Sequence, residues 1–165
     1  MIIQIKQQPV FSFIYFENVF VLDGCSCGWT AYNGFCYHVS STTRTRDQAQ
    51  KYCQRRGANL VKILSAEEND FVLALSHKFA PYKKGMWIGL KFWKEDKKYH
   101  WTDGSQMSYT NWALREPNGF AREPCAHIYT DPKRTQLNAL AGTWNDLQCG
   151  LQKNFHSGTV CEKLA

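Results

Sequence analysis

Residues 111 to 125 read Asn-Trp-Ala-Leu-Arg-Glu-Pro-Asn-Gly-Phe-Ala-Arg-Glu-Pro-Cys, and Trp-Asn-Asp at 144 to 146 precedes Cys149 further along the chain. Two prolines stiffen the first segment. Together the two segments offer side-chain oxygens from Glu116, Asn118, Glu123, Asn145 and Asp146. Oxygen ligands with no histidine or thiolate among them suit calcium far better than zinc or copper. The sequence therefore predicts that these segments meet to build one Ca²⁺ site.

The composition describes a single disulfide-containing domain outside the cytoplasm. The chain has 165 residues, enough for a sizeable core, and its six Trp, eight Tyr and ten Phe argue against disorder. Seven cysteines point to an oxidising compartment and a secreted protein, and their spacings are not those of zinc pairs. The odd number leaves one thiol free or one bond to another chain.

The formal net charge of +6 comes from 20 Lys and Arg against 14 Asp and Glu. The basic residues are scattered, with no long run, at Arg44, Arg46, Arg55, Arg56, Lys83, Lys84, Lys97, Lys98, Lys133 and Arg134. This pattern favours a solvated basic face over a nucleic-acid site, so no nucleic-acid partner is expected. A preference for anionic glycans or membranes would also fit.

Residues 1–24 form a separate N-terminal segment ahead of a domain over 25–165. Lys6 followed by an apolar run at 10–16 has the order of a secretion signal, but Glu17 and Asn18 interrupt it and no cleavage site precedes Cys25. The run is also too short to span a bilayer. A degraded or misassembled signal and an N-terminal strand packed on the domain are the two alternatives.

The domain itself predicts a mixture of helices and strands. Residues 28–37 indicate a hairpin around Asn33-Gly34, which places Cys25 and Cys36 close enough to bridge. Capping boxes at Thr45–Gln48 and Ser65–Glu68 start two helices, and Gly57 stops the first. Strands are expected at 59–63, 86–90, 99–102, 126–129 and 158–162. Residues 105–148 show little periodicity, which indicates an ordered functional loop.

These residues resemble a family, the C-type lectin-like domains in their long form with an N-terminal hairpin. The matching pieces run in order from Cys25 to Lys163 and include Gly28-Trp29, Cys36-Tyr37, Ala49-x-x-x-Cys53, Trp87-Ile88-Gly89-Leu90, Glu116-Pro117-Asn118, Trp144-Asn145-Asp146-x-x-Cys149 and Val160-Cys161-Glu162. The resemblance implies an α+β fold with two helices flanking small antiparallel sheets and a long irregular calcium- and sugar-binding loop region. It also implies the disulfides Cys25–Cys36, Cys53–Cys161 and Cys125–Cys149. Cys27 remains as a free thiol or an interchain bond that links a homodimer.

In the family pattern, the five side chains named above coordinate Ca²⁺, and the residue matching Asp146 adds its backbone carbonyl. Two vicinal hydroxyls of a sugar complete the shell, one held by Glu116 with Asn118 and the other by Glu123 with Asn145. Each carboxylate accepts a hydrogen bond from a hydroxyl, and each amide donates one. The family's bond before Pro117 is cis.

The Glu-Pro-Asn triplet resembles the mannose-type selector, which implies mannose, fucose, N-acetylglucosamine or glucose as ligand. Phe120 and Trp112 keep a galactoside open as an alternative, and a protein- or mineral-binding member of the fold is another. Gly119 and Pro124 fall where some members have acidic ligands of an auxiliary calcium site, so no complete second site is expected.

An enzyme is not expected. The five histidines are scattered, and the sequence has no nucleophile elbow, zinc-protease motif or phosphate loop. Pathogen or symbiont recognition in innate immunity, agglutination, venom action and mineral association are all compatible roles.

Overall fold

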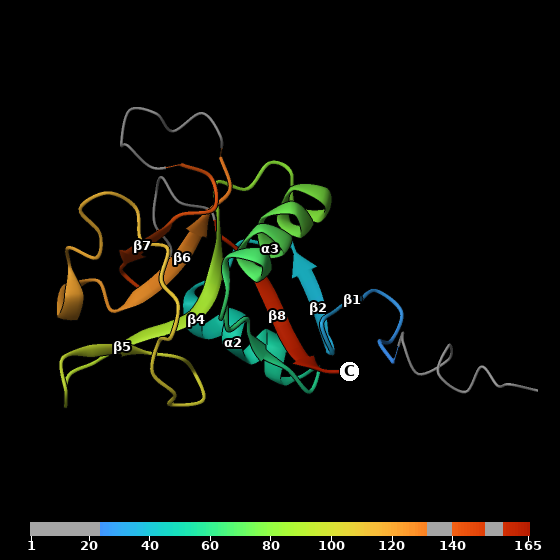
Figure 1. Ribbon diagram of the computed structural model, residues 1–165, viewed down its shortest axis with the longest axis horizontal. Coiled ribbons are helices and arrows are strands. Elements are labelled where there is room, and N and C mark those ends of the chain that lie inside the picture. The colour runs from blue at the N-terminus through green and yellow to red at the C-terminus, as the bar shows by residue number, and fades with distance from the viewer. Residues whose placement is uncertain (1–23, 132–139, 151–156) are drawn as a thin grey trace, which may run out of the picture.

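A computed structural model describes residues 24–131, 140–150 and 157–165 (Figure 1). Almost all of the expected N-terminal segment, residues 1–23, lies outside the described residues. The same holds for parts of the two long loops, at 132–139 and 151–156. Within the described ranges, no helix has the length and apolar character needed to cross a membrane.

The strands of the described chain join into one eight-stranded sheet in the order β1-β2-β8-β4-β6-β7, with β3 on β8 and β5 on β4. The bounds are β1 Thr30–Tyr32, β2 Phe35–Ser40, β3 Asn59–Leu60, β4 Gly85–Trp93, β5 Lys98–His100, β6 Cys125–Tyr129, β7 Trp144–Leu147 and β8 Gly158–Leu164. All pairs are antiparallel except β4 and β8, which pair in parallel at Met86↔Gly158 and Trp87↔Thr159. The α+β class is confirmed, but the expected small antiparallel sheets are joined through this parallel pair.

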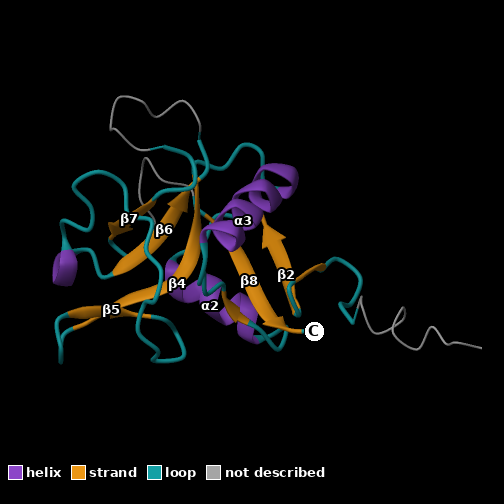
Figure 2. Cartoon of the chain, viewed as in Figure 1, coloured by secondary structure: helices purple, strands orange, loops and turns teal. Residues whose placement is uncertain are grey.

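Two α-helices, α2 (Arg46–Gln54) and α3 (Ala66–Phe79), accompany the sheet (Figure 2). The α2 start is the expected capping box, because the Thr45 side chain accepts from the Gln48 amide and the Gln48 side chain accepts from the Thr45 amide. Gly57 follows the helix in the left-handed region, with φ +68°. The chain thus leaves α2 at Gly57, as the sequence predicts.

The second expected capping box is only half formed. The Ser65 side chain accepts from the Glu68 amide, but Glu68 does not return a bond to Ser65. Its carboxylate instead accepts from the Leu64 amide at 2.7 Å and from the Tyr37 hydroxyl at 2.6 Å. The expectation of a reciprocal box was wrong because a tertiary partner on β2 competes for this carboxylate.

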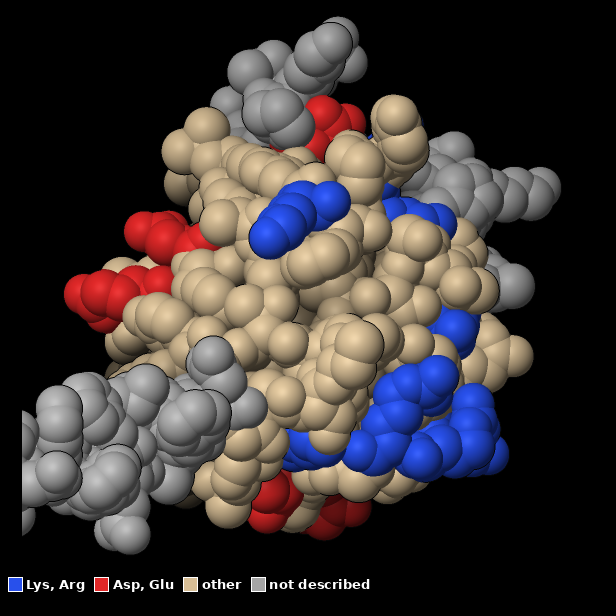
Figure 3. Space-filling view, turned by 90° about the vertical axis from the view of Figure 1, so that its right-hand side faces the viewer, with Lys and Arg blue, Asp and Glu red and all other residues tan. Residues whose placement is uncertain are grey.

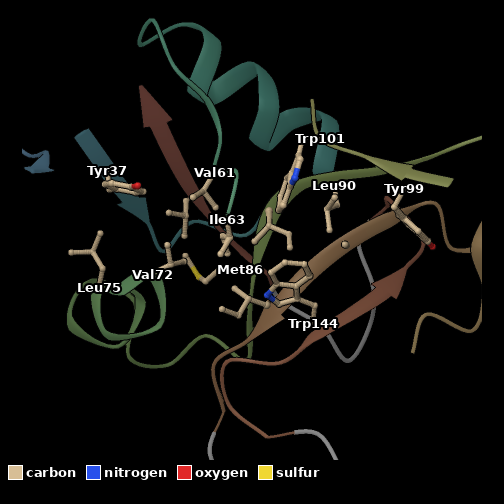
Figure 4. Packing of buried hydrophobic residues seen from close by; sticks show 14 of the residues in the cluster. Tyr37, Val61, Ile63, Val72, Leu75, Met86, Leu90, Tyr99, Trp101 and Trp144 are labelled. Carbon is tan, nitrogen blue, oxygen red and sulfur yellow. The ribbon is translucent and has the colours of Figure 1, made fainter. Parts of the chain in front are cut away.

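The core lies on both faces of the sheet. Successive residues of a strand point to opposite faces, and on β4 Met86 and Ile88 join one cluster while Trp87 joins another. The first cluster includes Val72 and Leu75 of α3 (Figure 4), and the second includes Ala49 and Cys53 of α2. Each helix therefore covers one face of the sheet with its apolar side.

All three expected disulfides are present, Cys25–Cys36, Cys53–Cys161 and Cys125–Cys149, and Cys27 is a free, exposed cysteine. The turn of the N-terminal hairpin is also as expected, because Asn33 and Gly34 both have positive φ between β1 and β2.

One strand was missed. β7 lies within the region expected to be irregular, and it pairs with β6 through Asp146↔Ala126 and Asn145↔His127. Its four residues alternate too briefly and contain too many polar groups to show a strand period. The pairing holds Asn145 and Asp146 in register at one end of the sheet.

Candidate functional site

The segment from Ala113 to Arg122 is attached to β7 at both of its ends. Its entry is held by backbone hydrogen bonds from the Trp144 amide to the Asn111 carbonyl, 2.7 Å, and from the Ala113 amide to the Trp144 carbonyl, 2.8 Å. Beyond this the chain turns through Arg115, φ +68°, and the cis bond between Glu116 and Pro117. A short 3₁₀ turn, η1 (Phe120–Arg122), closes the loop.

Asp146 anchors the other end of this loop. Its fully buried carboxylate accepts from the backbone amides of Asn118, Gly119 and Phe120 at 3.0, 2.9 and 2.9 Å. The Tyr99 hydroxyl lies 2.7 Å from the same carboxylate. Burial acts to raise the pKa of Asp146, but the hydrogen bonds from Tyr99 and the three amides outweigh it and lower that pKa. In this structure the Asp146 side chain is an ionised anchor for the loop.

The pKa of Glu116 is shifted in the opposite direction from that of Asp146. Burial raises its pKa to about 7, and a hydrogen bond with Asp146 and the charges of Asp146 and Glu123 act in the same direction. Its Oε2 is buried and has no hydrogen-bond partner among the described residues. A buried carboxylate oxygen without a donor is costly, so this group is prepared for a proton or a cation.

Glu123 approaches the same place from the far side of the loop. Its side chain packs on Gly119 so closely that a Cβ there would overlap the Glu123 Cβ, Cγ and Oε2. Burial raises the pKa of Glu123, the charge of Asp146 adds to this, and Arg122 partly opposes it. Three carboxylates, from Glu116, Glu123 and Asp146, thus act on one another electrostatically.

The two asparagines complete the group. Asn145 is buried next to Asp146 on β7, and its Nδ2 donates to the Asp146 carbonyl at 2.6 Å. The Asn118 side chain is exposed on the loop, while the backbone amide of Asn118 donates to the Asp146 carboxylate. The structure therefore brings all five sequence-predicted residues together around Asp146, although within the described ranges no three His, Cys, Asp or Glu side chains form a ready metal cage.

Calcium fits this group by its chemistry. All the side-chain groups offer hard oxygen ligands, and burial together with the charge of neighbouring carboxylates raises the pKa of Glu116 and of Glu123. The Asp146 carboxylate has four donors around it, so the four other side chains are the oxygens more open to an ion. The Asp146 carbonyl accepts from Asn145 Nδ2 and has one further lone pair to offer.

Sequence reasoning missed Tyr99 as a site residue. Its hydroxyl also lies 2.9 Å from the Glu123 carbonyl, which ties β5 to both halves of the site. Burial raises the pKa of Tyr99, with the hydrogen bond to Asp146 and the nearby carboxylates adding to the effect. The signal was available, because a tyrosine on the inward side of an alternating strand needs a partner for its hydroxyl.

An apolar groove of about 270 Å³ lies beside the loop, lined by Tyr99, Met107, Trp112, Pro117 and Phe120 with Lys97 and Lys98 at its border. Trp112 is half-buried and packs on Tyr99, with ring centroids 5.1 Å apart. Phe120 packs on Phe92 but keeps 48% of its surface exposed. Phe120 is therefore the aromatic side chain of this region that remains free to meet a ligand.

Comparison with known proteins matches residues 42–163 to the family described as "Lectin C-type domain". The chain is 36% identical to an alpha-N-acetylgalactosamine-specific lectin of Patiria pectinifera over 126 residues, 73% of this chain and 71% of that protein. It is 33% identical to a perlucin-like protein of Mytilus galloprovincialis over 138 residues, 83% of this chain and 81% of that one. Among solved structures, the cow C-type carbohydrate-recognition domain of CD23 in the presence of GlcNAc2Man3 oligosaccharide aligns with a TM-score of 0.69 and 30% identity, covering 86% of this chain and 96% of that one.

Proposed function

The chain belongs to the C-type lectin domain family, and on this basis we propose that it binds sugars through a Ca²⁺ ion held by Glu116, Asn118, Glu123, Asn145 and Asp146. Several of its relatives are by name lectins or carbohydrate-recognition domains, not enzymes. One observation carries the proposal: a buried Glu116 oxygen, subject to the charges of Asp146 and Glu123, lacks any donor among the described residues. A bound Ca²⁺ would supply the missing positive charge and leave room for two vicinal hydroxyls.

The side chains around that ion select the hydroxyls. A carboxylate oxygen accepts a hydrogen bond from a sugar hydroxyl, whereas an amide nitrogen donates one. Glu116 with Asn118 would hold one hydroxyl in both roles, and Glu123 with Asn145 the other. The Glu-Pro-Asn order supports equatorial vicinal hydroxyls, as in mannose, fucose and N-acetylglucosamine.

The proposal is tested by retention on mannose-agarose in Ca²⁺ and release by EDTA. Glu116→Ala and Asn145→Ala should each abolish retention without unfolding the domain. Glu95→Ala is the matched control, since Glu95 is exposed in the turn between β4 and β5. Failure of the unaltered protein to bind mannose, fucose and galactose resins would overturn the proposal.

A galactose-type ligand is the second candidate. Phe120 is half exposed on η1, where its ring can stack on the apolar face of a galactoside, and one relative is by name specific for alpha-N-acetylgalactosamine. Phe120→Ala should then reduce binding to N-acetylgalactosamine resin, whereas the mannose-type proposal predicts that it leaves binding to mannose nearly unchanged.

Secretion and a disulfide-linked homodimer are the remaining parts of the proposal. Three intramolecular disulfides suit an extracellular setting, and relatives of this family are mostly extracellular. Cys27 is exposed and free, so it is the thiol through which two chains would join. Electrophoresis without reductant should show a dimer that disappears in Cys27→Ser; a dimer that persists in this variant contradicts the assignment.

A further inference from the structure

Arg44, which precedes α2, and Arg56, which follows it, come together on the ring of Tyr52. The guanidinium carbon of Arg44 lies 4.0 Å from the centroid of the Tyr52 ring, and that of Arg56 lies 3.6 Å from it. Arg55 is close enough for its charge to act on Arg44. We call Arg44, Arg55 and Arg56 the arginine cluster. Figure 3, which views the molecule from the side of β1 and β2, shows Lys and Arg side chains gathered at the lower right of that face.

Hydrogen bonds hold this cluster in place. The Tyr52 hydroxyl lies 2.8 Å from His38 Nε2, and His38 Nδ1 lies 2.8 Å from the Gly28 carbonyl. Because that carbonyl can only accept, Nδ1 donates and the imidazole orients the Tyr52 ring. The Arg44 Nη1 donates to the Ser40 hydroxyl and the Arg56 Nη1 donates to the Tyr52 carbonyl. Both guanidiniums are thus oriented by the fold.

The charges of the cluster are not neutralised by the protein. In the described part of the chain, none of the three arginines forms an ion pair. Burial lowers the pKa of Arg44, the charges of Arg56 and Arg55 lower it further, and only Tyr52 acts against them. Orienting like charges side by side costs free energy. An anion bound to the arginine cluster would offset this repulsion.

The row of cations packed on aromatic rings continues beyond the arginine cluster. Trp29 packs on His38, with ring centroids 5.3 Å apart, and the Lys163 ammonium lies 4.5 Å from the Trp29 ring centroid. A line of cations on aromatic rings therefore runs from Arg56 to Lys163. It matches the repeated charges of a linear polyanion better than it matches a single small anion.

We propose that the arginine cluster binds a sulfated polysaccharide. A guanidinium presents paired N–H donors that match sulfate oxygens, and the disulfides indicate an extracellular setting, where sulfated chains occur. Trp29 and Tyr52 are half-buried beneath the cations, so the cluster has no aromatic side chain to insert into a membrane. The site is separate from the proposed sugar site, because Tyr52 lies on α2 and His38 on β2, in the middle and on the right of Figure 1, whereas the loop of residues 116–123 lies at its left edge.

The first test is retention of the full chain on heparin-agarose under a salt gradient, with Ca²⁺ and again with EDTA. Binding should be equal in both, because no metal takes part, so this result is independent of the mannose test. Arg44→Gln with Arg56→Gln should weaken heparin affinity by roughly tenfold or more. Lys94→Gln with Lys97→Gln, in the exposed β4–β5 turn, removes the same charge and should change affinity much less.

A second pair of variants separates an oriented site from general attraction. Tyr52→Leu keeps the net charge but removes the ring under the guanidiniums, and should weaken heparin binding; Tyr52→Phe keeps the ring and should retain most of it. Equal losses in the arginine and lysine pairs, or no difference between the Tyr52 variants, would overturn the proposal. Stronger cluster-dependent binding to phosphatidylserine vesicles than to heparin would also overturn it, in favour of a membrane surface.

Discussion

Asp146 and Glu116 are neighbours with opposite tendencies toward a proton. Asp146 is surrounded by three backbone amides and Tyr99, which keep its pKa low. Glu116 has a buried oxygen without a donor among the described residues, and burial beside two other carboxylates raises its pKa to about 7. The Asp146 carboxylate therefore holds the loop in place, whereas the protonation state of Glu116 would depend on whether a cation is bound.

Calcium affinity should depend on pH through Glu116. Its pKa in the folded, metal-free protein is above its ordinary 4.5, so the metal-free protein gains stability from the protonated form at low pH and loses that contribution as pH rises through about 7. Ca²⁺ must displace the proton, so affinity should fall by up to about tenfold per pH unit below 7. Calorimetric titration between pH 5 and 8 measures this. Glu116→Gln, which keeps one oxygen but cannot titrate, should show a flatter profile.

Sugar preference should follow the residues that flank Pro117. Glu116→Gln together with Asn118→Asp exchanges which side of the pair donates and which accepts, and so should move binding from mannose toward galactose. Competitive elution by the two monosaccharides measures the shift. If the unaltered chain already prefers galactose, the mannose-type assignment fails while the calcium site can stand.

At the scale of elements, α2 owes its position to local and tertiary contacts. Its capping box at Thr45 satisfies two orphan amides of the first turn, and its amide at Arg46 also donates to the Cys149 carbonyl at 2.9 Å. The start of the helix is thereby joined to Cys149, two residues beyond the end of β7. Changes that destabilise the start of α2 should therefore also destabilise β7, the strand that carries Asn145 and Asp146.

Removal of the cap gives a measurable cost. Thr45→Ala should lower the free energy of unfolding by about 1 kcal/mol, because the Gln48 amide loses its side-chain acceptor. Urea denaturation followed by tryptophan fluorescence measures the change. Thr42→Ala, at an exposed position before the helix, is the control and should stay within about 0.5 kcal/mol of the unaltered protein.

For the whole molecule, the disulfides close chain segments of very different size. Cys53–Cys161 spans 108 residues and joins α2 to β8, whereas Cys25–Cys36 spans 11 and closes only the hairpin. In the chain-entropy account the first should stabilise by about 4–5 kcal/mol and the second by about 3. Paired Cys→Ser variants at each bond, compared by thermal unfolding, measure the difference. Equal losses would show that loop size does not decide these contributions.

Much of the fold was predictable because its signals are local. The Asn33-Gly34 turn, the Thr45 cap and the apolar run at β4 each depend on residues close in sequence, and the structure confirms all three. The candidate site residues could be named in the same way, from oxygens clustered in two short segments. The disulfide pairings were implied by the family resemblance, and the structure confirms them too.

The sequence alone therefore predicted most of the elements and the candidate site residues from short-range signals, and its resemblance to the family implied the three disulfide pairings that the structure contains. Only the tertiary structure decided that β7 is a strand, that Glu68 turns to Tyr37, that Asp146 anchors the loop through Tyr99 and three amides, and that Arg44 meets Arg56 on Tyr52. These features depend on partners distant along the chain. Hydrogen-bond donors and charges compete for such partners only after the sheet has brought them within reach.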